Sequence, residues 1–360
     1  MKIMVAGDWH SELHEAAVYE AFVRLGHHVD RFSWHQYFRA PSGLFKSIKD
    51  IVRRAQNKFL FGPLLNRVNQ HLIEQVGHFE PDLLFVYRGT HIKASTLKKI
   101  KRLLPACILI GYNNDDPFAP GHPPWLWRHF LKAVPHYELM LAYRTANISE
   151  FVSAGAKRVE LLRSWFIPAR NYPIDRDKSA VKKYDCEVIF IGHYEPDDRV
   201  PCLEEIARRG WHLRLFGPGY DWDPVIRKSP ELRGQIPVHL LWGEEYNRAL
   251  CHSKIALCFL SKLNRDTYTR RCFEIPATGT MMLAEYTDDL ASMYREGEEV
   301  EFFRSPAEMM EKIERYVSDD ASRKKVAAGG LRRVHADGHD VDSRMRQVLT
   351  WVEDIRERQK

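Results

Sequence analysis

The chain of 360 residues lacks long apolar runs and is poor in cysteine. No stretch of about 18 apolar residues occurs in it, so the sequence predicts no membrane-spanning helix. Its six cysteines form no Cys-x-x-Cys pair and lie mostly inside apolar runs, which argues against a disulfide framework or a zinc site and predicts buried thiols. The net charge of +6 is too small for this length to indicate a nucleic-acid partner, but it suits a ligand that carries phosphate.

The composition is that of an ordinary globular protein, with 44% hydrophobic and 28% charged residues. The first apolar segment, residues 1–7, ends too soon for a signal peptide, so we expect a cytoplasmic protein. A chain of 360 residues exceeds the usual core of one domain, which makes two domains the simplest expectation.

Segments with the pattern of a strand alternate with helical segments in two rounds. We expect strands at 2–6, 28–32, 82–87, 107–111, 138–142 and 159–162 in the first round and at 186–192, 212–216 and 255–260 in the second. This alternation predicts an α/β fold with two Rossmann-like domains. The predicted boundaries are 1–167 for the first domain, 168–185 for a polar linker with prolines, 186–338 for the second domain and 339–360 for a C-terminal helix.

Two acids, Asp266 and Glu274, lie at the ends of a segment that follows the apolar strand 255–260. A polar loop comes directly after the strand, and Arg270 begins a helical pattern. In parallel α/β sheets, ligands bind at the carboxyl ends of strands, where loop side chains and helix N-termini face the same crevice. A carboxylate accepts hydrogen bonds from vicinal hydroxyls, so the two acids predict a site for a ribose and a sugar ring.

The segment 266–279 resembles the acid, seven residues, acid motif of retaining glycosyltransferases with the GT-B architecture. Glu274 stands before an Ala-Thr-Gly segment as the second acid of that motif does, and Asp266 stands where the first acid belongs. The arginines before Phe-Glu-Ile and the threonine at Thr287 are similar to those of the CgeB-like, spore-maturation-type branch. Two departures weaken the match on the sugar side: Asp266 is one methylene shorter than the usual Glu, and Thr280 replaces a frequent Gly.

The resemblance implies two Rossmann-like domains that face a central cleft, with the C-terminal helix returning to the N-terminal domain and packing across the junction. It implies a hexosyl-type transferase that moves a sugar from a nucleotide-diphosphate donor to a glycan, glycolipid or other hydroxyl acceptor, with retention. The residues implied for the donor nucleotide are Glu274, Arg270, Arg271, Arg199, His193, Gly192, Gly217 and Thr269; those on the sugar side are Thr287 and Asp288; and those expected to act in catalysis are Asp266, Asp116, Asp115 and His10.

Each assignment has a plainer alternative. The acids Asp266 and Glu274 could be surface groups that pair with the neighbouring arginines. The two aspartates before Pro117 could form a turn and a helix cap. His10 could be a satisfied loop histidine, and Arg199 a solvated charge.

A basic helical pattern occupies residues 44–61 of the first domain. Its apolar positions follow helical spacing and basic residues fill most of the others, which suits the surface of an anionic membrane. The alternative is a helix whose apolar side faces the core and whose basic side is solvated. In the first case, the protein would be cytoplasmic and peripheral at the inner face of the membrane, and the acceptor would be lipid-linked.

Sugar transfer from a nucleotide diphosphate needs fixed hydrogen-bond donors at the departing phosphate. Basic side chains can supply them, and we identify no Asp-x-Asp metal triad at a strand end in the second domain, so we expect no obligatory metal and no cofactor besides the nucleotide-sugar substrate. Two other functions remain open on the sequence: a nucleotide-sugar epimerase and a scaffold that binds a nucleotide sugar without turnover.

Overall fold

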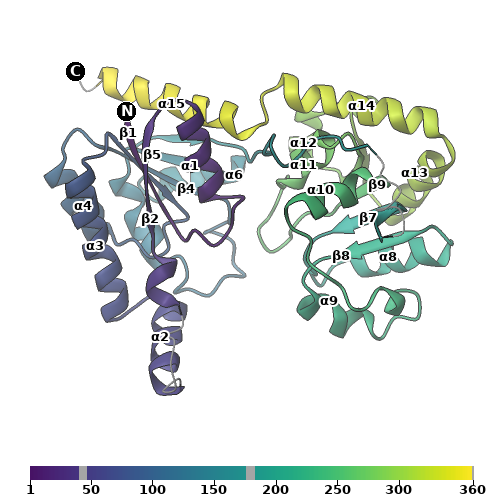
Figure 1. Ribbon diagram of the computed structural model, residues 1–360, viewed down its shortest axis with the longest axis horizontal. Coiled ribbons are helices and arrows are strands. Elements are labelled where there is room, and N and C mark those ends of the chain that lie inside the picture. Colours follow the sequence, from purple (N-terminus) through teal and green to yellow (C-terminus); the bar gives the residue numbers. More distant parts are fainter. Residues whose placement is uncertain (40–46, 176–182, 359–360) are drawn as a thin grey trace. The chain divides into compact units, whose positions relative to one another are not determined.

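The computed structural model describes residues 1–39, 47–175 and 183–358 (Figure 1). The chain forms two compact units, of which the first comprises Met1–Ser164 together with Val341–Lys360 and the second comprises Trp165–Asp340. Residues 176–182 of the predicted linker lie outside the described residues. The described part of the linker before them packs on the second unit, where the Nδ2 of Asn247 donates a hydrogen bond to the carbonyl of Tyr172 at 2.8 Å.

The first unit is built on a parallel sheet with the strand order β2-β1-β3-β4-β5-β6. Its strands are β1 (Lys2–Gly7), β2 (His28–Ser33), β3 (Leu83–Tyr87), β4 (Ile108–Asn113), β5 (Leu139–Ala142) and β6 (Val159–Leu161). Its helices are α1 (Glu15–Arg24), η1 (His35–Phe38), α2 (Ser47–Phe59), α3 (Pro63–Phe79), α4 (Ala94–Leu103), α5 (Arg128–Ala133), η2 (Val134–His136), α6 (Thr145–Ser153) and α15 (Val341–Arg358).

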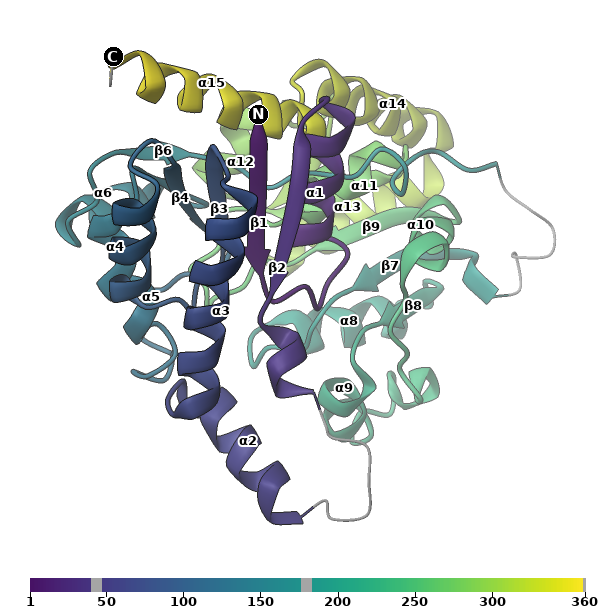
Figure 2. The same ribbon diagram turned by 60° about the vertical axis from the view of Figure 1, so that its left-hand side comes forward.

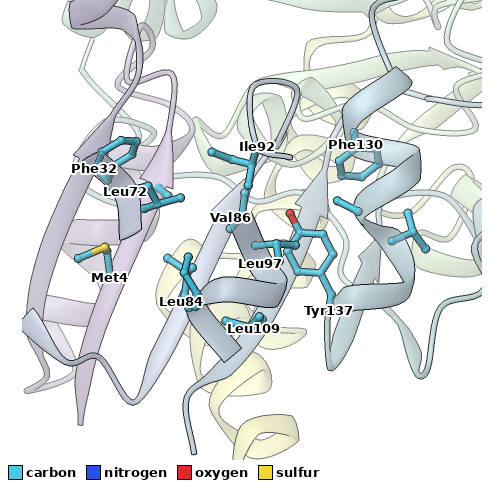
Figure 3. Close-up of a cluster of buried hydrophobic side chains, with 14 of the residues drawn as sticks. Met4, Phe32, Leu72, Leu84, Val86, Ile92, Leu97, Leu109, Phe130 and Tyr137 are labelled. Atoms are coloured by element: carbon cyan, nitrogen blue, oxygen red, sulfur yellow. The ribbon is translucent and has the colours of Figure 1, made fainter. Parts of the chain in front are cut away.

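Helices cover both faces of this sheet, which is why β3 and β4 are buried along their whole length. On one face, α3 lies beside α4 in both views (Figures 1 and 2). Figure 3 shows the core beneath them, where Leu72 and Leu97 from these helices meet Met4, Leu84 and Leu109 from the strands. On the other face, α1 packs on the sheet through residues such as Phe22, whose ring lies 6.1 Å from that of Phe85.

The C-terminal helix α15 returns to the N-terminal domain, as predicted. Its buried stripe repeats every three or four residues, at Val341, Met345, Val348, Val352 and Ile355, and α15 packs on α1. An ion pair lies at each end of α15: Asp342 pairs with Arg24 of α1 at 2.6 Å, and Arg356 pairs with Asp82, directly before β3, at 3.1 Å.

The second unit holds a parallel sheet with the strand order β11-β10-β9-β7-β8. Its strands are β7 (Cys186–Ile191), β8 (Leu213–Phe216), β9 (Ser253–Cys258), β10 (Met281–Glu285) and β11 (Glu301–Phe303). Its helices are α8 (Arg199–Arg208), α9 (Gly219–Ile226), η3 (Arg233–Gln235), α10 (Gly243–Cys251), α11 (Arg271–Ala277), α12 (Asp288–Met293), α13 (Pro306–Ser318) and α14 (Asp320–Ala336). Residues of α8 and α13 form the core on one face, and α10, α11 and α14 contact strands of the sheet elsewhere.

The predicted α/β class and the predicted strands are confirmed, with ends that differ by one or two residues. The cysteines are unpaired and buried, except Cys251, which is half-buried. Within the part of the chain that the structure describes, no helix combines the length and the apolar character needed to cross a membrane.

Candidate functional site

Glu274 is the most enclosed of the acids predicted for the site, apart from Asp116 of the first unit. It lies in α11, after the loop that follows β9, and only 3% of its surface is exposed. Its Oε2 accepts a hydrogen bond from the Tyr246 hydroxyl at 2.8 Å, and its Oε1 accepts one from Nε of Arg270 at 2.7 Å. Because an ionised carboxylate has about four lone-pair sites, each oxygen can accept a further bond from a ligand hydroxyl.

Tyr246 supports Glu274 from the neighbouring helix α10. Burial, and then the Glu274 carboxylate, raise the pKa of Tyr246 well above its ordinary value. The phenol therefore keeps its proton and donates a hydrogen bond to Glu274. Glu274 does pair with Arg270, as the plainer alternative expected, but it is a buried acceptor and not a surface acid.

The loop that carries Asp266 is tied to α12. The backbone N–H of Asp266 donates to the carbonyl of Ser261 at 2.8 Å, and Asp266 itself is half-buried. Thr287 donates from its hydroxyl to the carbonyl of Thr267 at 2.6 Å while the same oxygen caps α12. Thr287, predicted for the sugar side, therefore positions the loop, and its contact with a sugar stays a prediction.

Two further predicted residues lie at the edges of this loop. Asp288 is exposed, and its Oδ1 accepts a hydrogen bond from the hydroxyl of Tyr286 at 2.9 Å. Thr269 lies two residues before α11, and its carbonyl accepts a hydrogen bond from the N–H of Cys272 at 2.9 Å.

Gly192 and Gly217 bring the ends of β7 and β8 together. A Cβ at Gly217 would lie 2.1 Å from the carbonyl oxygen of Gly192, a distance that no real Cβ tolerates. That same oxygen accepts a hydrogen bond from the indole N–H of Trp222 at 2.8 Å. Glycine at 217 is thus required by close approach of two backbones, which brings the loops after two strands to one place.

Arg271 lies next to the same turn. Its Nη1 donates to the carbonyl of Ile191 and its Nη2 to that of Phe259, at 3.3 and 3.4 Å, and a Cβ at Gly192 would lie 2.9 Å from Nη1. Its Nε is buried and has no hydrogen-bond partner among the described residues. Arg271 thus joins Gly192 and Gly217 in one cluster, while Arg270 turns to Glu274.

Arg199 is buried and committed to its own loop. Its guanidinium donates to both oxygens of Asp197 at 2.7 Å and to the carbonyl of His193 at 2.6 Å. The solvated charge of the plainer alternative is therefore wrong for Arg199. The bidentate pair of Arg199 with Asp197 organises the loop after β7. A direct contact between Arg199 and a phosphate stays a prediction, and it would require Asp197 to share Arg199 with the phosphate. His193 is exposed, and its Nδ1 lies 3.2 Å from Oδ2 of Asp221.

A pocket of about 350 Å³ opens at the carboxyl ends of β7, β9, β10 and β11. Its walls include Arg199, Phe259, Lys262, Tyr286 and Arg304. Glu274 and Arg270 are not among the lining residues, so the pocket adjoins the loops of the candidate site without containing its best-supported acid.

In the first unit, Asp115 and Asp116 follow β4 but have different environments. Asp116 is fully buried, and its Oδ1 accepts hydrogen bonds from the N–H of Phe118 and from Nδ2 of Asn147, both at 3.0 Å. Asp116 therefore forms the turn that was the alternative to a catalytic role for the two aspartates before Pro117. Asp115 pairs with Arg88 at 2.8 Å and retains partial exposure, so it is the better placed of the two to meet an acceptor.

His10 lies in the loop after β1 and is exposed. Its ring lies 5.4 Å from that of His35, whose Nδ1 is 3.5 Å from Oδ1 of Asp8. The loop after β1 and the start of η1 therefore bring a carboxylate and two imidazoles together near the carboxyl ends of β1 and β2. His10 as a catalytic residue stays a prediction.

Sequence reasoning missed Glu15, which lies beneath this loop. Its Oε1 accepts the N–H of Asp8 at 2.9 Å, and a Cβ at Gly7 would lie 2.2 Å from its Cγ. Burial is the main reason that the pKa of Glu15 rises to about 7. The only signal in the sequence was an acid in the first helical turn after a strand and a glycine, which is common in surface helices too.

The described residues contain no group of three or more His, Cys, Asp or Glu side chains arranged to hold a metal ion. An Asp-x-Asp sequence does occur at 221–223, inside α9, and there Oδ1 of Asp223 accepts the N–H of Val238 at 3.0 Å. Metal independence stays a prediction.

Replacing Gly217 by Ala is expected to destabilise the second unit, because the new methyl group would overlap the Gly192 carbonyl. Overpacking of this kind costs roughly 1–3 kcal/mol, measurable as a loss of unfolding free energy in urea. Gly234→Ala is the matched control, since a Cβ there meets nothing within 4 Å. Equal stability of the two variants would contradict the close approach.

Glu15→Gln is expected to stabilise the protein increasingly as the pH rises from 5 to 8. In the folded protein the pKa of Glu15 is about 7, above the ordinary value of 4.5, so ionisation of Glu15 lowers the free energy of unfolding once the pH exceeds 4.5. The loss grows as the pH rises and reaches roughly 3 kcal/mol above pH 7. Glutamine keeps the acceptor for Asp8 without the charge. Thermal melts at each pH measure the gain, and Glu20→Gln, on the exposed side of α1, is the control. A pH-independent difference would contradict the burial of a charge at Glu15.

Residues 199–350 match the model of a family described as glycosyl transferase-like. No curated protein is similar enough in sequence to match this chain.

Several solved structures share the whole fold at low identity. Alr3699/HepE from Anabaena, in complex with UDP and glucose, has a TM-score of 0.66 and 12% identity, over 98% of this chain and 100% of that chain. Sucrose-phosphate synthase from Thermosynechococcus elongatus has a TM-score of 0.68 and 11% identity, over 99% of this chain and 100% of that chain. A UDP-forming trehalose-phosphate synthase from Burkholderia xenovorans has a TM-score of 0.63 and 12% identity, over 98% of each chain. The chain therefore has the GT-B fold, and its residues 199–350 match a family described as glycosyl transferase-like.

Proposed function

We propose that this protein is a glycosyltransferase that moves a hexosyl group from a nucleotide-diphosphate donor to a hydroxyl of a glycan or a lipid-linked acceptor. The observation that carries the proposal is Glu274, a buried carboxylate held by Tyr246 and Arg270 at the carboxyl side of a parallel sheet. It lies inside the glycosyl transferase-like region 199–350. The solved complexes of Alr3699/HepE with UDP-glucose support a nucleotide-sugar donor.

In this proposal, Glu274 accepts hydrogen bonds from the ribose hydroxyls of the donor. A hydrogen bond from a hydroxyl to a charged carboxylate is stronger than one between two neutral groups. The lone pairs that Tyr246 and Arg270 leave unused are available for it.

The donor diphosphate would lie against the turn formed by Gly192 and Gly217. The close approach of the two glycine backbones holds this turn in place, and Arg271, which donates to the carbonyl of Ile191 beside it, brings a positive charge to the same turn. During transfer, the bond between the anomeric carbon and the phosphate oxygen breaks, and the acceptor oxygen forms the new bond as its hydroxyl loses a proton. Negative charge grows on the departing diphosphate, so cations fixed beforehand lower the barrier.

The finer features belong to the same proposal. Membership of the CgeB-like branch rests on the arginines before Phe273 and on Thr287. Transfer with retention follows from that resemblance, and independence of metal from basic side chains that can take the place of a cation at the departing phosphate. A cytoplasmic location fits a nucleotide-sugar substrate.

A scaffold that binds a nucleotide sugar without turnover is the second candidate. One observation favours it: Arg199 and Arg270 are both engaged by carboxylates of the protein, which leaves fewer cations for a leaving group. Product analysis separates the two candidates, because a scaffold would bind the donor without releasing nucleoside diphosphate.

The first experiment is a thermal melt of the protein with UDP, GDP, ADP, CMP and dTDP, each with and without a chelator. A ligand at about a hundred times its Kd adds roughly 2.7 kcal/mol of stability, which appears as a shift of several degrees. One nucleotide that shifts the melt with chelator present would support metal-independent nucleotide binding and identify the base of the donor, and product analysis then separates the transferase from the scaffold. No shift with any of them would contradict nucleotide binding.

Glu274→Gln and Glu274→Ala are expected to weaken binding of that nucleotide at least ten-fold, because a charge-assisted hydrogen bond contributes about 1.5–3 kcal/mol. Glutamine preserves the volume and a partner for Tyr246, so it separates lost binding from lost folding. Glu244→Gln is the matched control, since Glu244 forms the same kind of helical pair, with Arg248 at 2.6 Å, on an exposed surface. Unchanged affinity in Glu274→Gln would remove Glu274 from the site.

Asp266→Asn is expected to leave the affinity for free nucleoside diphosphate unchanged while it lowers the rate of transfer roughly 10- to 100-fold. The reason is that Asp266 would contact only the donor sugar, so its charge acts on the reacting ring. Calorimetry with the nucleotide and release of nucleoside diphosphate give the two readouts, with Glu298→Gln as a surface control. Equal losses in both would contradict the division of roles between Asp266 and Glu274.

A further inference from the structure

Helix α2 of the first unit exposes its apolar side instead of burying it. With 3.6 residues per turn, Ile51, Val52, Ala55 and Phe59 fall within an arc of about 100°. Ile51 is 66% exposed, Val52 49% and Phe59 39%. Phe61, just past the helix, is 50% exposed. Large apolar side chains gathered in this way mark an interaction surface.

A different side of α2 packs on the protein. Gln56 and Leu60 are buried there, and Oε1 of Gln56 accepts the N–H of Leu64 at 2.9 Å. On the same side, Arg53 donates to the carbonyl of Phe38 in η1. The helix is therefore held by polar contacts, and the prediction of a core-facing apolar side is wrong for the described residues of the segment 44–61; residues 44–46 lie outside them.

Basic residues flank the exposed apolar arc. Arg54 and Lys58 lie on one edge of it and Lys49 on the other, and all three are exposed. The single acid of α2, Asp50, lies off the arc and pairs with Arg53 at 3.2 Å. The surface thus combines apolar side chains with positive charge and has no negative charge of its own at its edges.

The surface continues beyond the helix. The ring of Phe59 lies 5.2 Å from that of Trp125, which is half-buried and follows the exposed prolines 123 and 124. Both ribbon views show α2 extending beyond the other elements of the first unit (Figures 1 and 2). A protruding helix can meet an extended flat partner without a clash from the rest of its domain.

We propose that α2 and Phe61, the α2 surface, dock this protein on a bilayer that contains anionic phospholipids. Aliphatic and aromatic side chains would enter the boundary between headgroups and acyl chains, and the flanking lysine and arginine heads would remain at the lipid phosphates. Nucleic acid would use the cations but would leave Ile51 and Val52 in water. An anionic membrane satisfies both components of the surface.

Helix α2 is attached to the same edge of the first sheet as the residues predicted to meet the acceptor. Oδ1 of Asn57 lies 2.9 Å from Nε2 of His91, in the loop after β3, and the carbonyl of Leu60 accepts from Arg128 at 2.7 Å. The helix is therefore attached at the carboxyl edge of the first sheet, the edge that also carries Asp115. If the protein is the proposed transferase, docking at this edge favours an acceptor that is itself anchored in the membrane.

The test is co-sedimentation of the full-length protein with vesicles of phosphatidylcholine, with and without phosphatidylglycerol. We expect binding only to the anionic vesicles and loss of it at high salt, because surface charges are then screened. Replacing Arg54 and Lys58 together by Ser is expected to weaken binding roughly 25-fold, at about five-fold per charge. Replacing Ile51 and Val52 together by Ser is expected to weaken it at least ten-fold.

Matched controls carry the same changes elsewhere on the first unit. Val23 and Val152 are exposed apolar residues, 46% and 58%, and their double replacement by Ser should leave binding unchanged. Lys99 and Lys132 are exposed on α4 and α5, and their double replacement by Ser removes the same charge as the Arg54 and Lys58 pair.

Absence of binding to anionic vesicles at low salt would overturn the proposal. Equal losses in test and control pairs would also overturn it, because binding would then follow net charge alone. If the wild type dimerises and the Ile51 and Val52 variant is monomeric without any vesicle binding, the surface is a protein interface instead. None of these readouts depends on sugar transfer, so failure here leaves the proposed activity separately testable.

Discussion

The candidate site depends on keeping one carboxylate charged beneath the surface of the second unit. Glu274 is nearly inaccessible to water, and an ionised group in that position is stable only with hydrogen-bonded partners. Tyr246 and Arg270 provide them from α10 and from the residue before α11. The same contacts that neutralise the acid therefore fix α11 against α10 and hold Glu274 in one orientation. A ligand with vicinal hydroxyls would find its acceptor already positioned, which limits the entropy lost on binding.

A second constraint is the contact between backbones at the ends of β7 and β8. Gly217 lies so close to Gly192 that no side chain fits between their two backbones, and Arg271 packs against the same turn. The bidentate pair of Arg199 and Asp197 lies within the loop after β7. Most of the charged groups here are paired within the protein, so the edge of the sheet is organised before any ligand arrives. Such an arrangement suits stabilisation of developing charge, which requires fixed dipoles and cations.

The first unit uses its acids differently. Asp116 closes a turn, Asp115 pairs with Arg88, and Glu15 supports the loop after β1 from below. The elevated pKa of Glu15 means that this support carries a cost in stability near neutral pH. The α2 surface adds an exposed apolar arc on the same unit, at the carboxyl edge of its sheet. In the proposals made above, the α2 surface of the first unit meets a partner, and Glu274 and Arg271 of the second unit meet a nucleotide.

The alternation of apolar strands and helices in the sequence was enough for the α/β class and for the strands to within one or two residues at their ends, because periodicity and length restrict local structure strongly. The return of α15 came from the resemblance to GT-B glycosyltransferases. The sequence also singled out Glu274, since an acid after a buried strand and before a small-residue turn is an uncommon pattern. Only tertiary structure decided which charges are paired. Arg199 meets Asp197 two residues away, but the partner of Glu274 in α10 is 28 residues away and that of Asp116 is 31 away. Burial of Glu15 and exposure of Ile51 depend in the same way on packing between elements distant in the chain, which no local pattern specifies.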